Sequence, residues 1–381
     1  MIYLDNSATT KLDERVSAAM QPYLGERYGN ASSIHSLGRE VKVALEEARE
    51  SVARSIGADA AEIVFTSGGT EANNYAITGA IFSELKRNKA FFDCSILTSP
   101  IEHHAVLEPV RFLEELGVSM INSSVDENGV ISIGNLPKRL TLSSLMYVNN
   151  EVGTINDVKQ LASEIKEAAP EALIHTDAVQ AMGKIKFDVH ELGIDLLSVS
   201  AHKIHGPKGI GALYIRRGVQ IEPLLHGGSQ ERNRRGGTEA VALAVGFGEA
   251  ARLAREEFDA RADHIKKLRD DLLTQLTSMS EVVINSLSDE RCVDSIVNIS
   301  FVSEVLQRID EEALIFNLDL AGIAVSNGAA CTSGTLQPSH VLRAMGKGDE
   351  VAAKSIRISL SKDNLASDID LFVAALIKII R

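Results

Sequence analysis

Apolar and polar positions alternate regularly along the first two thirds of the chain, in a repeating order of short and long segments. Short apolar runs bounded by polar or glycine-rich residues predict buried strands at residues 2–4, 63–66, 95–98, 145–148, 172–174, 195–197 and 210–215. Helical spacing of apolar residues predicts a helix capped near residue 13, helices at residues 37–56, 72–85 and 158–168, and one ending at residue 116. This alternation predicts an α/β fold with a mostly parallel sheet, whose strands gather ligand groups at their carboxyl ends.

The pattern changes in the last third of the chain. Residues 239–276 show a nearly unbroken helical pattern with many charges in its second half, which predicts a long helix connecting two domains near Phe258. Further strands are predicted at residues 282–284, 295–301 and 354–360, with helices at residues 310–320 and from residue 368. We therefore predict a large domain over residues 13–257, and a small α+β domain that combines residues 1–12 with residues 258–381.

Composition and charge exclude several classes of function. The chain has 381 residues and a net charge of -13, with 4% aromatic residues and no Trp. A chain of this charge repels phosphate backbones and offers few stacking surfaces, so we expect no direct nucleic-acid binding. The amino terminus shows no signal-peptide pattern, and no uncharged apolar run reaches the length of a membrane span. We expect a soluble, cytoplasmic protein that does not bind membranes.

Cysteine and histidine positions give no sign of a metal site or a disulfide framework. The three cysteines, Cys94, Cys292 and Cys331, form no CxxC pair and have no metal-like spacing with histidines. His103 and His104 follow the strand at residues 95–98 and could either ligate a metal or move protons. We expect no metal, because no further ligand lies at helical spacing from this pair.

Polar side chains follow the predicted strands of the large domain at Thr70, His103, Asn150, Asp177 and Lys203. Taken singly, each has an ordinary explanation, such as a tight turn, a helix cap or a solvent-exposed lysine. Taken together, they match the needs of pyridoxal phosphate. A strand, glycine-rich turn and helix can bind its phosphate through free backbone N–H groups. A lysine can hold the cofactor as a Schiff base while an acid pairs with its ring nitrogen.

A loop rich in glycine and arginine covers residues 224–238. One interpretation is a basic patch for nucleic acid, which the negative net charge of the chain disfavours. Anchoring of a phosphate group or of a partner subunit fits the loop better, because arginine binds phosphate and carboxylate groups through paired hydrogen bonds.

Six segments resemble, in order, the signatures of the cysteine desulfurases of the NifS and IscS type, which belong to the class V aminotransferase group. They are residues 5–10 (DNSATT), 66–71 (TSGGTE), 149–151 (NNE), 176–180 (TDAVQ), 200–203 (SAHK) and 235–239 (RGGTE). The resemblance covers nearly the whole chain. It implies fold type I of the pyridoxal phosphate-dependent transferases, with a large domain that binds the cofactor and a small domain that carries the loop of the catalytic cysteine.

The resemblance also implies how the cofactor is held. Lys203 would form the Schiff base, and Asp177 would pair with the protonated ring nitrogen. Gln180 would bind the ring hydroxyl, while His103 would stack on the ring and shuttle protons. The residues that would hold the phosphate are Gly69, Thr70, Ser200 and His202, joined by Thr238 from a second subunit. The last of these implies a homodimer.

The implied substrate is L-cysteine, with its carboxylate bound by Asn150 and Arg357. Cys331 would attack the substrate's sulfur, giving alanine and a persulfide on Cys331, so that the enzyme is a sulfurtransferase. Cys331 lies in a loop of very small residues between Gly328 and Gly334, which favours this role over that of a buried structural thiol.

Two other functions are weighed against this one. A selenocysteine lyase could use the same site, and a non-catalytic sulfur carrier or partner protein could retain the fold, although the presence of Lys203 and Asp177 argues against the latter. The sulfur-acceptor protein could be an iron–sulfur scaffold, a tRNA- or cofactor-thiolation protein, or part of a DNA sulfur-modification system.

Overall fold

The computed structural model describes residues 1–327 and 338–381, and its largest sheet has seven strands. Their order across the sheet is β2 (Ile63–Thr66), β10 (Gly211–Ile215), β9 (Leu196–Ser200), β8 (Leu173–Asp177), β7 (Leu142–Ser144), β3 (Ser95–Thr98) and β4 (Ser119–Asn122). Neighbouring strands are parallel, except that β10 runs antiparallel to both β2 and β9. The predicted α/β fold with a mostly parallel sheet is confirmed.

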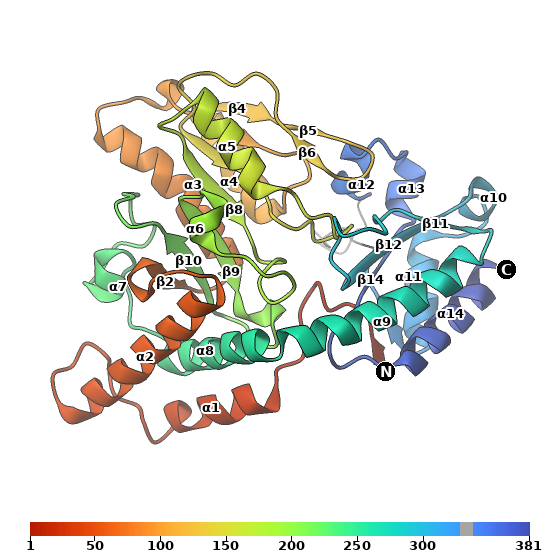
Figure 1. Cartoon of the computed structure of the whole chain (residues 1–381), viewed down its shortest axis with the longest axis horizontal. Helices are drawn as coiled ribbons and strands as arrows, with labels where there is room; N and C mark the ends of the chain where they lie inside the picture. Colours follow the sequence, from red (N-terminus) through yellow and green to blue (C-terminus); the bar gives the residue numbers. More distant parts are fainter. Residues whose placement is uncertain (328–337) are drawn as a thin grey trace.

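Helices cover both faces of this sheet (Figure 1). On β10, Ala212 and Tyr214 join one hydrophobic cluster with helices α2 (Ser36–Ser55) and α8 (Val241–Glu256), whereas Leu213 joins a second cluster with α3 (Gly69–Lys86) and α4 (His104–Glu115). Successive residues of a strand point to opposite faces, so a strand covered on both sides must be apolar at every position. This explains why these strands appear in the sequence as continuous apolar runs.

Most predicted helices are present with small shifts at their ends. Asp13 caps α1 (Glu14–Leu24) by accepting a hydrogen bond from the Arg15 backbone N–H. The predicted helices at residues 37–56 and 158–168 are confirmed as α2 and α5 (Val158–Ala168). Helix α3 begins three residues earlier than predicted, directly after Gly68.

The predicted strand at residues 145–148 is wrong. The strand of this region is β7 (Leu142–Ser144), and the residues after it do not pair with β3. Leu145 still donates its backbone N–H to His175 O at 3.2 Å. The next N–H, that of Met146, donates to the Glu102 carboxylate at 2.6 Å instead of to a neighbouring strand. Tyr147 N–H still donates to Asp177 O of β8 at 3.0 Å, so the apolar run keeps its contact with β8 after the pairing with β3 has ended.

The predicted single helix over residues 239–276 is also wrong, because it is divided at Glu257 into α8 and α9 (Phe258–Thr277). The two helices follow one another across the molecule (Figure 1). Phe247 and Leu253 of α8 belong to the core around the large sheet, while Leu268 and Leu272 of α9 belong to a separate core. The two halves of the helical segment thus bury their apolar side chains in different cores.

The second core surrounds a three-stranded antiparallel sheet of the order β11 (Val282–Ile284), β12 (Ile296–Phe301) and β14 (Ile356–Ser359). Helices α9, α11 (Glu311–Leu320) and α14 (Ala366–Ile380) contribute apolar side chains to it. The amino terminus joins this part, since β1 (Ile2–Tyr3) pairs in parallel with β13 (Ile323–Ala324) and Leu4 lies in the same core. The domain limits 13–257 and 1–12 with 258–381 remain a prediction.

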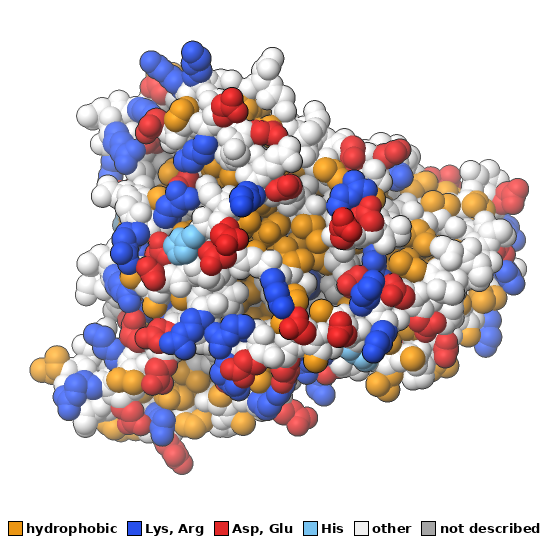
Figure 2. Space-filling model, viewed as in Figure 1, with side chains coloured by type: hydrophobic (Ala, Val, Ile, Leu, Met, Phe, Trp, Pro, Cys, Tyr) orange, Lys and Arg blue, Asp and Glu red, His pale blue; other side chains and the backbone are white. Residues whose placement is uncertain are grey.

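Short elements complete the described part of the chain. They are β5 (Ser124–Val125), β6 (Ile131–Ser132), α6 (Val189–Leu192), α7 (Gln230–Asn233), α10 (Ser303–Leu306), α12 (His340–Ala344), α13 (Asp349–Ala353) and the 3-10 turns η1 (Ala60–Glu62), η2 (Phe91–Asp93) and η3 (Ala201–Lys203). Acidic and basic side chains are interspersed over the face shown in Figure 2. In residues 1–327 and 338–381, no helix combines the length and the apolar character that crossing a membrane requires.

A buried ion pair fixes the loop that follows β10. The Arg49 guanidinium of α2 donates to both carboxylate oxygens of Glu231, at 2.6 and 2.9 Å, and both side chains are 3% exposed. Glu231 also accepts a hydrogen bond from the Phe65 backbone N–H. The backbone φ angles of Glu231 (45°), Arg232 (58°) and Asn233 (63°) lie in the left-handed region. Such a conformation costs a non-glycine residue ~1–2 kcal/mol, so the ion pair holds a strained turn in place.

We predict that Arg49→Met lowers the free energy of unfolding by ~3–5 kcal/mol, because it leaves the Glu231 carboxylate buried without its partner. The matched control is Arg54→Met on the same helix, where Arg54 is 67% exposed and pairs with Glu50 at the surface. That change should cost less than ~0.5 kcal/mol. Urea unfolding followed by circular dichroism measures both. Equal midpoints for the two variants would contradict the structural role of the buried pair.

Candidate active site

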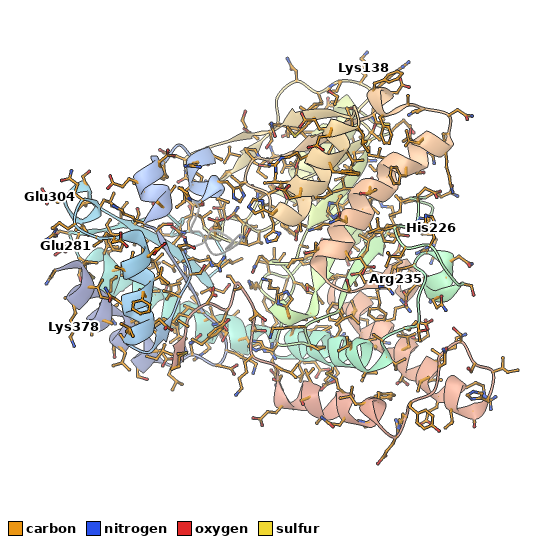
Figure 3. The ribbon with its side chains drawn as sticks, turned by 180° about the vertical axis from the view of Figure 1, so that it is seen from behind. Lys138, His226, Arg235, Glu281, Glu304 and Lys378 are labelled. Carbon is orange, nitrogen blue, oxygen red and sulfur yellow. The ribbon has the colours of Figure 1, made fainter. Side chains whose placement is uncertain are left out.

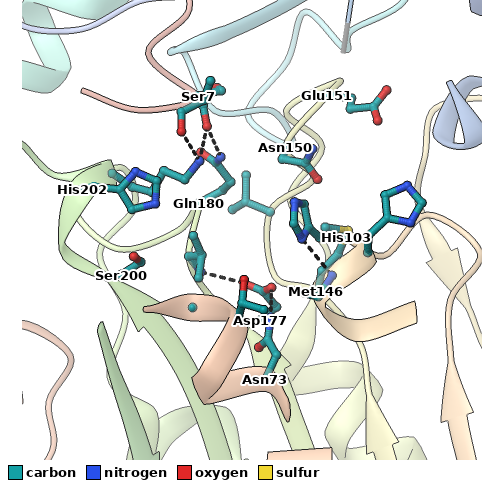
Figure 4. A pocket seen from close by; sticks show the side chains of 18 of the residues that line it. Ser7, Asn73, His103, Met146, Asn150, Glu151, Asp177, Gln180, Ser200 and His202 are labelled. Carbon is teal, nitrogen blue, oxygen red and sulfur yellow. Dashed lines mark hydrogen bonds between the residues drawn. The ribbon is translucent and has the colours of Figure 1, made fainter. Parts of the chain in front are cut away.

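A cavity of about 440 Å³ lies between the carboxyl ends of the large sheet's strands and the part of the molecule that contains β14 (Figure 4). This volume suits a small-molecule ligand. Ten of the residues that the sequence singled out line it: Gly69, Thr70, His103, Asn150, Asp177, Gln180, Ser200, His202, Lys203 and Arg357. The fold therefore brings together side chains that are spread over most of the sequence.

Lys203 ends the short turn η3 directly after β9, and its side chain lines the cavity. Its Nζ donates to the backbone carbonyl of Ala8 at 2.9 Å and to that of Ser7. Burial and the positive charge of Arg357 lower the pKa of Lys203 to about 8, against the opposing effect of Asp177 and Asp5. A lysine in this environment carries a substantial neutral fraction near neutral pH, which a nucleophilic amine requires.

Asp177 is the last residue of β8 and is buried. One carboxylate oxygen accepts from the Val179 backbone N–H at 2.9 Å, as expected for a residue that caps a turn. The other oxygen accepts from the Asn73 side chain at 2.6 Å (Figure 4). The carboxylate is thereby fixed in orientation and remains available to a cationic group in the cavity.

His103 caps the amino terminus of α4, because its Nδ1 accepts from the Ala105 backbone N–H at 3.0 Å. Burial lowers the pKa of His103, and the positive charge of Lys203 adds to this, against the opposing effect of Asp177. The imidazole is therefore neutral at pH 7. With Nδ1 acting as acceptor, the proton of the neutral ring lies on Nε2.

One wall of the cavity can hold an anion. Thr70 lies in the first turn of α3, where backbone N–H groups without helical partners and the helix dipole favour negative charge. A side chain at Gly69 would have its Cβ 2.8 Å from Val179, so only glycine fits. Ser200 and His202 line the same cavity, and burial lowers the pKa of His202 to about 4.

The opposite wall carries a guanidinium. Arg357 of β14 donates to the Asn150 backbone carbonyl at 3.0 Å and to Asp5 at 2.8 Å. Within the described residues, Arg357 Nε and the Asn150 side-chain oxygen are buried without a hydrogen-bond partner. A buried donor left unpaired is costly, so an anionic ligand that binds Arg357 would satisfy a group the protein leaves open.

Two predicted residues do not line this cavity in the described structure. Thr238 lies beside a separate cavity of about 220 Å³, together with Arg235 and Glu231. Cys331 lies outside the described residues. The other two cysteines are buried, and burial raises the pKa of both, to about 11 in Cys292.

Sequence analysis missed two acids beside the site. Burial raises the pKa of Glu102 well above its usual range, and that of Glu151 to about 7. Glu151 lines the cavity and accepts from Ser339 Oγ at 2.5 Å, whereas one oxygen of Glu102 has no partner among the described residues. Their adjacency to His103 and Asn150 was the available signal, but a glutamate after a strand is ordinarily expected at the surface.

Asn73 and Lys184 were also missed. Asn73 is 1% exposed although it lies on α3, so a polar side chain on the buried face of an apolar helix was the available signal. Lys184 follows the motif at residues 176–180 by four residues, and nothing in the spacing distinguished it from a surface lysine.

Comparison with known proteins shows which proteins this chain is similar to. Residues 2–372 match the model of the aminotransferase class-V family. The chain is 46% identical to the cysteine desulfurase IscS of Dictyoglomus turgidum, over 100% of this chain and 94% of that protein. A solved NifS-like protein has a TM-score of 0.90 and 38% identity, covering 99% of this chain and 98% of its own. SspA, solved in complex with cysteine, has a TM-score of 0.81 and 31% identity, with 96% and 100% covered.

We predict that Lys203 in the apoprotein reacts with acetic anhydride with a midpoint near pH 8, as its pKa of about 8 requires. This lies well below the ordinary lysine value of about 10.4. Arg357→Met should move the midpoint to higher pH, because removal of a nearby cation favours the protonated amine.

Mass spectrometry of labelled peptides over a pH series measures both midpoints. Lys186→Met is the control, since Lys186 is exposed and pairs with Asp259. A midpoint unchanged by Arg357→Met would show that the two cations do not interact.

Proposed function

This chain belongs to the aminotransferase class-V family and, within it, to the cysteine desulfurases, and on that premise we propose that it converts L-cysteine to L-alanine as a sulfurtransferase. The family depends on pyridoxal phosphate. The observation that carries the proposal is the convergence of Lys203, Asp177 and Arg357 on one cavity. A non-catalytic carrier of the same fold would have no need of a lysine with a lowered pKa at this place.

The residues of the cavity fit pyridoxal phosphate. Lys203 would bind its aldehyde carbon, and Asp177 would pair with its ring nitrogen, since a close carboxylate favours the protonated form. The amino-terminal turn of α3 would receive the phosphate, where Gly69 allows close approach of the backbone. When bound, the cofactor supplies a ring that accepts the electron pair released from the substrate's Cα.

Arg357 and Asn150 would bind and orient the substrate. The unpaired Nε of Arg357 would donate to the α-carboxylate of L-cysteine, and the Asn150 side chain lies on the same wall. Arginine matches a carboxylate in a planar geometry, which fixes the Cα–H bond relative to the proton acceptor.

Two groups of this chain can move protons at the substrate. Lys203, with a pKa of about 8, would accept the proton from Cα as a free amine. The neutral His103 would exchange a proton through Nε2, because Nδ1 is held by the Ala105 N–H. Burial favours the neutral form of both groups, which these steps require.

We assign the sulfur-accepting thiol to Cys331 on the grounds of reach and elimination. Ser326 and His340, which flank residues 328–337 closely in the sequence, both line the cavity. A segment of five residues spans up to ~17 Å when it is extended. The length of chain between Ser326 and Cys331 therefore allows the Cys331 thiol to reach the cavity. Cys94 and Cys292 are buried thiols with raised pKa values.

In the reaction, the Cys331 thiolate would attack the sulfur of L-cysteine, so that an S–S bond forms as the Cβ–S bond breaks. The electron pair of the broken bond stays on the carbon side, and protonation of Cβ gives L-alanine. Cys331 is left as a persulfide, whose outer sulfur passes to a sulfur-acceptor protein. Electrons balance without an added oxidant.

We further propose a homodimer in the cytoplasm. In the described structure, Thr238 lies outside its own chain's cavity, which favours a contribution to the cavity of a partner. Large apolar side chains are exposed between the end of α1 and the first half of α2, as a subunit interface requires. They are Leu24, Tyr28, Ile34, Leu37 and Val43.

We predict that Cys331→Ser abolishes sulfide release from L-cysteine in the presence of dithiothreitol, while the visible absorption of the bound cofactor persists. The serine hydroxyl cannot form a persulfide. Labelled sulfur from the substrate should appear on residue 331 of the wild type only. Cys94→Ala is the control, because Cys94 is buried away from the cavity and should leave the rate unchanged. Sulfide release by Cys331→Ser at the wild-type rate would exclude the assigned thiol.

We predict that Thr238→Val weakens cofactor binding about tenfold, as the loss of a hydrogen bond to a charged group would. Mixed dimers of Thr238→Val chains with Lys203→Met chains should regain one site of wild-type affinity, because the native Lys203 and the native Thr238 then meet across the interface. Cofactor titration after co-refolding, with sedimentation to confirm two chains, measures this. If the mixed dimers show no site of wild-type affinity, Thr238 does not contribute to the cofactor site of the partner subunit.

A further inference from the structure

A second lysine, Lys184, lies close behind the cavity. It follows Gln180 by four residues through a turn, in which Lys184 N–H donates to Ala181 O at 3.0 Å and Gly183 has a left-handed φ of 74°. The turn brings the two side chains together. The Lys184 ammonium donates to the side-chain oxygen of Gln180. Lys184 itself is only partly exposed, and it does not line the cavity.

Both ends of the Gln180 amide are occupied. Gln180 is 4% exposed, and its NH₂ group donates to the backbone carbonyl of Ser7 at 2.9 Å (Figure 4). Ser7 O also accepts from Lys203 Nζ. A continuous chain of hydrogen bonds thus runs from Lys184 through Gln180 and Ser7 to Lys203.

The ammonium group and the Ser7 carbonyl, at opposite ends of the amide, together determine which way the amide points. The two ends of a glutamine amide have nearly the same shape, so hydrogen-bond partners decide their placement. An ammonium has donors only, and it can therefore face the oxygen but not the NH₂ group. With its oxygen held by Lys184, Gln180 must present its NH₂ group to Ser7 and to the cavity.

The surroundings of Lys184 disfavour its charged form. Burial, together with the nearby positive charges of Lys203 and Arg357, lowers its pKa to about 7. Lys186, on the same segment, instead pairs with Asp259 at the surface, at 2.6 Å. A cation placed against a neutral amide, beside two other cations, gains little stability by itself.

We propose that Lys184 is a positioning residue, which holds Gln180 so that a hydrogen-bond donor faces the ring hydroxyl of the cofactor. This rests on the proposed function, because the ring hydroxyl belongs to pyridoxal phosphate. A donor stabilises the anionic form of that oxygen, whereas the amide oxygen would repel it. The lysine therefore acts on the cofactor through Gln180 rather than by contact.

The test compares cofactor affinity in apoprotein variants by absorbance titration. Lys184→Met should weaken binding about tenfold, the effect of misplacing one hydrogen bond to an anion. Lys184→Arg, which also has donors only, should keep most of the affinity. Lys186→Met, the matched loss of a lysine at the surface, should bind as wild type. In Gln180→Met, the further change Lys184→Met should have no additional effect.

A second readout separates positioning from general stability. The pH midpoint of the bound cofactor's visible band should rise in Lys184→Met, because the anionic oxygen loses its donor and the site loses a cation. Lys184→Arg should restore the wild-type midpoint. If Lys184→Met does not fold, Lys184→Gln serves in its place, since its amide no longer forces the orientation.

Wild-type affinity and midpoint in Lys184→Met would overturn the inference, as would an equal loss of affinity in the Gln180→Met background. The proposed function fails separately. In that case the wild-type chain itself would bind no pyridoxal phosphate, or would form no alanine from L-cysteine.

Discussion

The candidate site depends on gathering positive charges in a partly buried cavity. The charge of Arg357 lowers the pKa of Lys203 and that of Lys184 behind the cavity, and the charge of Lys203 lowers the pKa of Lys184 as well. The protein offsets this repulsion with the Asp5 and Asp177 carboxylates and with backbone carbonyls of the amino-terminal segment. Such a site is incomplete without anions. A ligand with a phosphate at one end and a carboxylate at the other would supply negative charge where the protein has left it short.

This charge balance is possible because two hydrophobic cores meet at the cavity. Asp177 and Lys203 come from strand ends of the large sheet, while Arg357 comes from β14 of the smaller sheet. The amino-terminal segment connects them, since Leu4 packs in the smaller core and Ser359 N–H donates to Leu4 O at 2.7 Å. Each core can be rigid by itself, and the groups between them remain positioned for a ligand. Helices α8 and α9 join the two parts away from the cavity (Figure 1).

Sequence patterns predicted the sheet well because its strands are covered on both faces and are therefore apolar throughout. The same signal failed at residues 145–148, where the apolar run outlasts the pairing with β3 and the Met146 N–H donates to the Glu102 carboxylate. Motif resemblance identified ten residues that line the cavity, since chemistry fixes their types. Lys184 and Glu102 escaped because their importance arises from burial, which neither spacing nor residue type reveals.

The loop after β10 has a strained backbone, which lowers the stability of the protein but fixes the conformation of the loop. The left-handed backbone conformation of Glu231, Arg232 and Asn233 is unfavourable. It persists because Arg49 holds the Glu231 carboxylate inside the protein. Arg235 lies just beyond this turn (Figure 3). Nothing in this chain's own cavity requires that conformation, because Thr238 lies beside a different cavity. Strain that serves no local site is explained if the loop serves a site elsewhere. In the homodimer proposed above, the second copy of the chain would provide that site, and the strained turn would be the means by which one subunit completes the phosphate site of the other.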